Sequence, residues 1–97
     1  MLIDDFSIAL SDCDLASPLH TAKVRLDVDI TEMLPRVAPA VEKAEFIPEV
    51  PVLVWKESSH KYALRPREIE ISNVADRDEA NELVAAVVEK LNEIWAA

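Results

Sequence analysis

The sequence contains no glycine among its 97 residues. Glycine lets a backbone approach a phosphate group closely and adopt a positive φ without steric penalty. Phosphate-binding P-loops, dinucleotide-binding fingerprints and the nucleophile elbow of hydrolases all require it. The sequence therefore excludes these three motifs. Tight turns must use other residues, and the candidates for positive φ are Asn73, the pair Ser58 and Ser59, and the pair Asp12 and Asp14.

Cysteine is almost absent as well, because Cys13 is the only one. A single thiol cannot form an internal disulfide, which excludes a small secreted scaffold held together by disulfides. The amino terminus has no basic region and reaches an acidic residue at Asp4, unlike a secretory signal. No apolar run approaches the roughly 20 residues that span a bilayer. These features predict a cytoplasmic protein.

Positive charge is scarce, with 10 Lys and Arg residues against 19 Asp and Glu residues and a net charge of −9. A chain of this kind repels polyanions, which disfavours nucleic acid and anionic membranes as partners. A protein with a basic surface is easier to accommodate. The length and the 51% hydrophobic content suit one folded domain over residues 1–97.

Alternating apolar residues predict strands near the amino terminus, over residues 2–10 and 22–30. The second alternation is the clearer of the two. One face carries Ala22, Val24, Leu26, Val28 and Ile30, and the other carries Lys23, Arg25, Asp27 and Asp29. This pattern is typical of an antiparallel sheet with one face in water.

Apolar residues recur at helical spacing over the next segment, from a predicted N-cap at Thr31 to about Ala44. Pro35 and Pro39 predict that this helix is short, kinked or broken. Further strands are predicted over residues 50–55, 61–64 and 68–71. A long final helix is predicted from Asp76, which forms an Asp variant of a capping box with Glu79. The order ββαβββα indicates an α+β fold, an antiparallel sheet with two helices packed on one face.

One loop gathers the residues that could bind a metal, namely Cys13, Asp12, Asp14 and His20. The alternative is a small buried thiol with solvated neighbours. The two adjacent carboxylates disfavour the thiolate that nucleophilic or redox chemistry would require. Both histidines, His20 and His60, are predicted to lie at the surface.

Two carboxylate pairs could in principle supply an acid and a base, Asp27 with Asp29 and Glu68 with Glu70. Carboxylates on an exposed strand face usually belong to its solvated side, and this interpretation is favoured. Three aromatic residues, Trp55, Tyr62 and Trp95, could form a binding platform, but core packing or the rim of a subunit contact is favoured.

Four segments carry a resemblance to a known family: residues 29–35, 52–56, 60–73 and 76–80. They resemble the amino-terminal domain of a family of iron-sulfur (4Fe-4S) cluster proteins. The resemblance covers nearly the whole chain, and relatives also carry a cysteine near the position of Cys13. In that family the domain precedes a Cys-Gly-x-Cys-Gly module like the cluster-binding part of corrinoid iron-sulfur proteins. That module is absent from these 97 residues, and one thiolate cannot hold a four-cysteine cluster.

The resemblance implies anaerobic redox or corrinoid chemistry as the context, and no ligand set. Three functions follow as hypotheses. The first is a non-catalytic accessory or docking domain beside an iron-sulfur or corrinoid protein, with the cluster held by the partner or by the missing module. The second is metal or cluster binding through Cys13 together with a partner or a dimer mate. The third is an enzyme of unrecognised type. A homodimer is also compatible with a sheet that leaves one face open.

Overall fold

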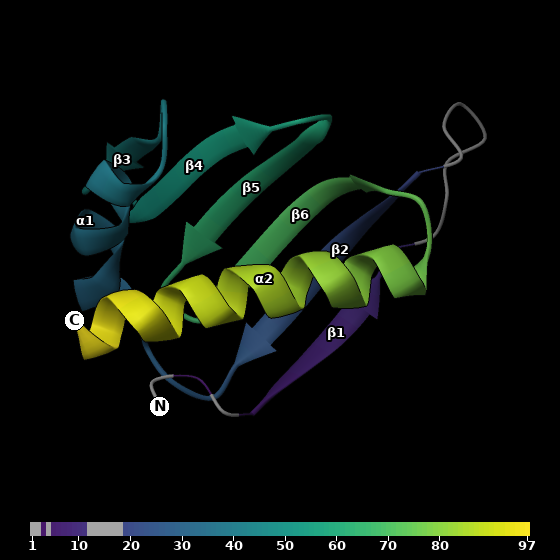
Figure 1. Ribbon diagram of the computed structural model, residues 1–97, viewed down its shortest axis with the longest axis horizontal. Coiled ribbons are helices and arrows are strands. Elements are labelled where there is room, and N and C mark those ends of the chain that lie inside the picture. Colours follow the sequence, from purple (N-terminus) through teal and green to yellow (C-terminus); the bar gives the residue numbers. More distant parts are fainter. Residues whose placement is uncertain (1–2, 4, 12–18) are drawn as a thin grey trace.

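The computed structural model describes residue 3, residues 5–11 and residues 19–97. These residues form six strands: β1 (Phe6–Leu10), β2 (His20–Leu26), β3 (Glu45–Ile47), β4 (Val52–Glu57), β5 (His60–Arg65) and β6 (Glu68–Val74). All neighbouring strands pair antiparallel in one sheet of order β1-β2-β6-β5-β4-β3. The helix α2 (Arg77–Ala96) lies across one side of this sheet (Figure 1). The predicted α+β class is confirmed, and β3 is an added edge strand that the sequence did not predict.

The alternation in β2 is confirmed up to Leu26, where the strand ends four residues before the predicted boundary. The chain turns at this point because the Asp29 carboxylate accepts hydrogen bonds from the Thr31 N–H, at 2.8 Å, and from the Thr31 hydroxyl. Ile30 then leaves the ladder and donates its N–H to Pro66 O at 2.7 Å. Its side chain is fully buried all the same. The alternation of apolar residues in the sequence therefore continues beyond the end of the strand.

The proline-containing segment is broken, as predicted. It consists of two 3₁₀ turns, η1 (Thr31–Met33) and η2 (Ala38–Ala40), with α1 (Leu34–Val37) between them. The predicted N-cap at Thr31 is wrong, because its hydroxyl donates to Asp29 and Ile30 occupies the cap position. The predicted end near Ala44 is also wrong, since the helical conformation stops at η2.

The amino terminus of α2 has the predicted capping arrangement. Asp76 Oδ1 accepts a hydrogen bond from Glu79 N at 2.9 Å, and Glu79 Oε1 accepts one from Ala75 N at 3.2 Å. The buried side of the helix consists of Ala80, Val84, Val87, Val88 and Leu91. These residues pack with the apolar side of the sheet and with α1 to form one core. The sheet thus has a side covered by α2 and an opposite side, which we call the outer face.

Three of the described residues have positive φ: Lys43 at 59°, Ser58 at 55° and Asn73 at 64°. Ser58 and Asn73 were among the predicted turn residues, whereas Lys43 was not. Asn73 Nδ2 also donates to Ser59 O at 2.9 Å, which ties the β4–β5 turn to the end of β6. The predicted turn at Asp12 and Asp14 lies outside the described residues.

Candidate functional site

The predicted metal group is described only in part. Cys13, Asp12 and Asp14 lie outside the described residues. His20 opens β2, and its Nδ1 lies 2.6 Å from the carbonyl oxygen of Ser11. Within the described part of the chain, no three His, Cys, Asp or Glu side chains gather as metal ligands. A role for Cys13 in metal binding stays a prediction.

The pair Glu68 and Glu70 lies on the outer face, as the alternation predicts, and Arg65 contacts both carboxylates. Arg65 Nη1 lies 2.8 Å from Glu70 Oε2 and 3.6 Å from Glu68 Oε2. On the other flank, β2 places Lys23 opposite Glu70 and Arg25 opposite Glu68. Each carboxylate therefore lies opposite a basic residue on β2, and Glu68 also lies opposite Arg65 on β5.

The second predicted pair, Asp27 and Asp29, does not form a strand face, because β2 ends at Leu26. The hydrogen bonds from the side chain and then the backbone of Thr31 lower the pKa of Asp29. A carboxyl group with a lowered pKa is ionised at neutral pH and therefore has no proton to donate. Asp29 therefore serves the turn before η1.

The outer face changes character across the sheet, as the register shows. One cross-strand row runs through Lys23, Glu70, Ala63, Val54 and Glu45. The row beside it includes Arg25, Glu68 and Arg65, and β3 adds the pair of Ile47 with Val52. Charged residues thus cover the outer face of β2 and β6 and the two ends of β5, whereas Ile47, Val52, Val54 and Ala63 form a smaller apolar area over β3, β4 and the middle of β5.

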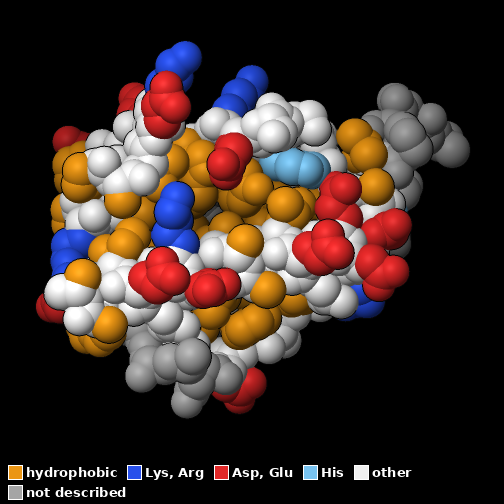
Figure 2. All heavy atoms as spheres, viewed as in Figure 1, with side chains coloured by type: hydrophobic (Ala, Val, Ile, Leu, Met, Phe, Trp, Pro, Cys, Tyr) orange, Lys and Arg blue, Asp and Glu red, His pale blue; other side chains and the backbone are white. Residues whose placement is uncertain are grey.

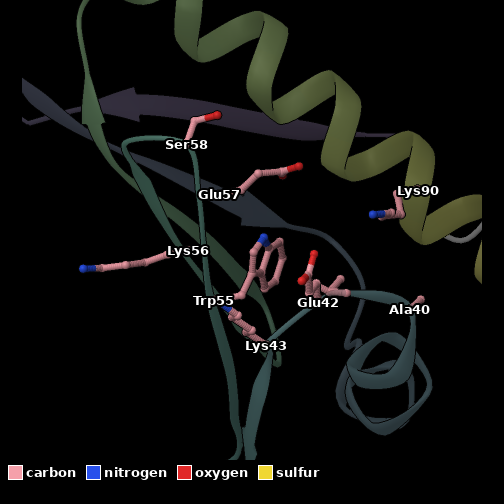
Figure 3. Close-up of a pocket in the computed structure, with 9 residues that line it drawn as sticks. Ala40, Glu42, Lys43, Trp55, Lys56, Glu57, Ser58 and Lys90 are labelled. Atoms are coloured by element: carbon pink, nitrogen blue, oxygen red, sulfur yellow. The ribbon is translucent and has the colours of Figure 1, made fainter.

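The side of the sheet that faces α2 is only partly covered by this helix. Figure 2 shows hydrophobic side chains in a hollowed area beside the helix, with acidic side chains along the helix itself. A hollow of about 340 Å³ lies between β4, the segment after η2 and α2, and we call it the Trp55 hollow. Its walls include Glu42, Lys43, Trp55, Glu57, Ser58 and Lys90 (Figure 3).

Trp55, which lines the hollow, belongs to an aromatic stack. Trp55 and Tyr62 face each other across β4 and β5 with their ring centroids 4.9 Å apart and their planes 3° from parallel. Both are buried, with exposed fractions of 7% and 4%. Trp95 lies elsewhere, 43% exposed, with the Arg36 guanidinium 5.7 Å from its ring. The three aromatic residues therefore form no common platform, and core packing is confirmed for Trp55 and Tyr62.

His60 is more enclosed than the predicted surface histidine, with a side chain 14% exposed. Its Nδ1 lies 3.2 Å from Ser72 O, and its Nε2 lies 3.6 Å from Glu79 Oε1. The sequence did not predict the contact of His60 with Glu79, because the two residues are far apart in the chain and come together only in the folded structure. Burial, followed by the charges of Glu57 and Glu79, raises the pKa of Tyr62. The phenol therefore stays protonated at neutral pH.

No family model, curated protein sequence or solved structure matches this chain. The resemblance to iron-sulfur cluster proteins thus stays a prediction. Among the described residues, no helix has both the length and the apolar character that crossing a membrane requires.

Proposed function

We propose that this chain is a non-catalytic docking domain that binds a protein partner through the outer face of its sheet. The observation that carries the proposal is the one-sided covering of that sheet. The helix α2 packs on one side only, and the outer face presents an apolar area next to charged rows. An apolar area rimmed by polar residues is typical of protein contacts.

The apolar area supports docking because two of its four side chains keep part of their apolar surface in contact with water. Ile47 and Val54 are half-buried, while Val52 and Ala63 are almost covered, at 7% and 8% exposure. None of these four residues belongs to the core cluster under α2. A partner that covers them would remove apolar surface from water without rearranging the core.

The charges of the outer face indicate the chemistry of the partner. Its strands carry five of the ten basic residues, Lys23, Arg25, Lys56, Lys61 and Arg65, against three acidic residues, Glu45, Glu68 and Glu70. This local excess of positive charge contrasts with the net charge of −9. Net charge alone favours a basic partner, whereas this face favours one whose contact surface has an acidic rim.

The class of partner rests on the sequence resemblance. We propose an iron-sulfur or corrinoid protein of anaerobic redox metabolism, which itself carries the cluster. No ligand from the present chain is needed for this arrangement. Catalysis by Glu68 and Glu70 is disfavoured, since Arg65 holds both carboxylates on the outer face.

The experiment is anaerobic capture of partners by the tagged chain, with iron and acid-labile sulfide measured in the bound fraction. The test variant K23Q/R25Q/K61Q neutralises three basic residues of the outer face. We expect it to capture about tenfold less iron-bearing protein than the native chain, which corresponds to about 1.4 kcal/mol of binding free energy.

The matched control is R36Q/R77Q/K90Q, which removes the same amount of charge away from the outer face. It should capture iron-bearing protein within about twofold of the native level, a difference of about 0.4 kcal/mol. Equal losses in the two variants would show a nonspecific charge effect. Captured protein without iron or sulfide would overturn the proposed class of partner.

A further inference from the structure

Within the described residues, the indole N–H of Trp55 has no hydrogen-bond partner. The residue is 7% exposed, and its ring stacks on Tyr62. Every fully buried side-chain nitrogen or oxygen in the described part of the chain does have a hydrogen-bond partner. The indole nitrogen is therefore not sealed in the core and must face a space that solvent or a ligand can enter.

The space it faces is the Trp55 hollow. Figure 3 shows the indole standing in this hollow, with its nitrogen turned toward the end at which Glu57 and Ser58 lie. The stack on Tyr62 fixes the plane of the ring. A donor on a rigid, buried ring loses little conformational entropy on binding, which favours recognition of an acceptor atom.

Charges of both signs reach into the same hollow from different elements. Lys90 extends from α2, Glu57 from the end of β4, and Glu42 from the segment after η2 (Figure 3). No ion pair joins Lys90 to either carboxylate within the described residues. Unpaired charges that face a common space are complementary to a molecule that carries both signs.

We propose that the Trp55 hollow binds a small zwitterion of the α-amino acid class. The ligand carboxylate accepts hydrogen bonds from Trp55 Nε1–H and from the Lys90 ammonium group. The ligand ammonium group lies toward Glu42 and Glu57. The hollow, at about 340 Å³, accommodates one small molecule of this class. The site is on the side of the sheet opposite the proposed docking surface and does not depend on it.

The test follows the indole N–H of Trp55 directly by ¹⁵N–¹H correlation spectroscopy. The chain has two tryptophans, so the variant W95F leaves a single indole signal. L-alanine, L-leucine and L-glutamate are titrated in turn, with N-acetylalanine and alaninamide as probes that lack one of the two charges. We expect a saturable shift with at least one free amino acid, with Kd below about 1 mM, and binding about tenfold weaker for both blocked probes.

Matched variants assign the charges. K90Q and E57Q should each weaken binding by about fivefold to tenfold, or about 1–1.4 kcal/mol. K23Q is the control, because Lys23 lies on the outer face of β2 and does not line the hollow, and it should leave the affinity unchanged. The proposal fails if no free amino acid gives a saturable shift at about 10 mM, a concentration well above the expected Kd. It also fails if blocked and free probes bind equally, or if K23Q and K90Q behave alike. None of these results bears on capture through the outer face.

Discussion

Replacement of the N-cap of α2, Asp76→Ala, tests how much one side-chain hydrogen bond contributes to the docking of the long helix. The Asp76 carboxylate accepts from Glu79 N at 2.9 Å, and the site is exposed. Water can therefore hydrate the freed N–H after the substitution, and the second bond, from Ala75 N to Glu79 Oε1, remains. We expect a loss of about 1 kcal/mol in the free energy of unfolding. For a domain of this size this lowers Tm by about 4–8 °C.

The assay is urea unfolding followed by circular dichroism, with two further variants. Asp76→Asn keeps an oxygen acceptor and should lose only a few tenths of a kcal/mol. Asp78→Ala removes an acid from the same first turn whose side chain makes no hydrogen bond within the described residues, and it should lose no more than about 0.5 kcal/mol. Equal losses for Asp76→Ala and Asp78→Ala would refute the hydrogen-bond explanation in favour of a general effect of charge on the helix dipole.

Three further outcomes follow from other contacts. Tyr62 is the only tyrosine, so phenolate absorbance near 295 nm reports the titration of this side chain alone. The pKa of Tyr62 should lie above 10.0 in the folded chain and return toward that value in urea. Because the folded state holds this proton more tightly, stability should fall as pH rises above about 10, and Tyr62→Phe should remove that part of the fall; an unshifted phenol would contradict burial of the ring. Leu64→Ala should lower the free energy of unfolding by about 2–5 kcal/mol, since Leu64 is fully buried, and a loss below about 1 kcal/mol in urea titrations would place it outside the core. Glu70→Gln should lose at most about 1 kcal/mol, because both partners of its 2.8 Å contact with Arg65 are partly exposed, and the difference should shrink in high salt; a larger, salt-independent loss would indicate another role.

Periodicity predicted the long elements because a single pattern of burial governs each of them. The stripe of α2 and the alternation of β2 both match buried positions, such as Val84 and Val24. Periodicity failed where local hydrogen bonds decide the geometry. The Asp29 carboxylate accepts a hydrogen bond from Thr31 N and so stabilises a turn there. Ile30 is nevertheless buried, so the alternation of apolar residues extends past the end of the strand. The short strand β3 has three residues, too few for a periodic signal.

The candidate sites were predictable only in part. The sequence identified the charged side of the sheet, including Glu68 and Glu70, because alternation assigns faces without knowledge of strand order. It could not predict that Lys90 and Glu57 face the same hollow, since α2 and β4 are joined by no local pattern. The contact of His60 with Glu79 was missed for the same reason.

The left-handed turns at Lys43, Ser58 and Asn73 affect the unfolded state of this chain as well as its native structure. Each turn places a side chain where glycine would be free of strain, which disfavours the native backbone locally. The same side chains restrict the backbone of the unfolded chain, and no residue anywhere in the sequence has the freedom of glycine. The unfolded ensemble is therefore smaller at every turn. Backbone strain at these three residues destabilises the native state, whereas the smaller gain of entropy on unfolding stabilises it.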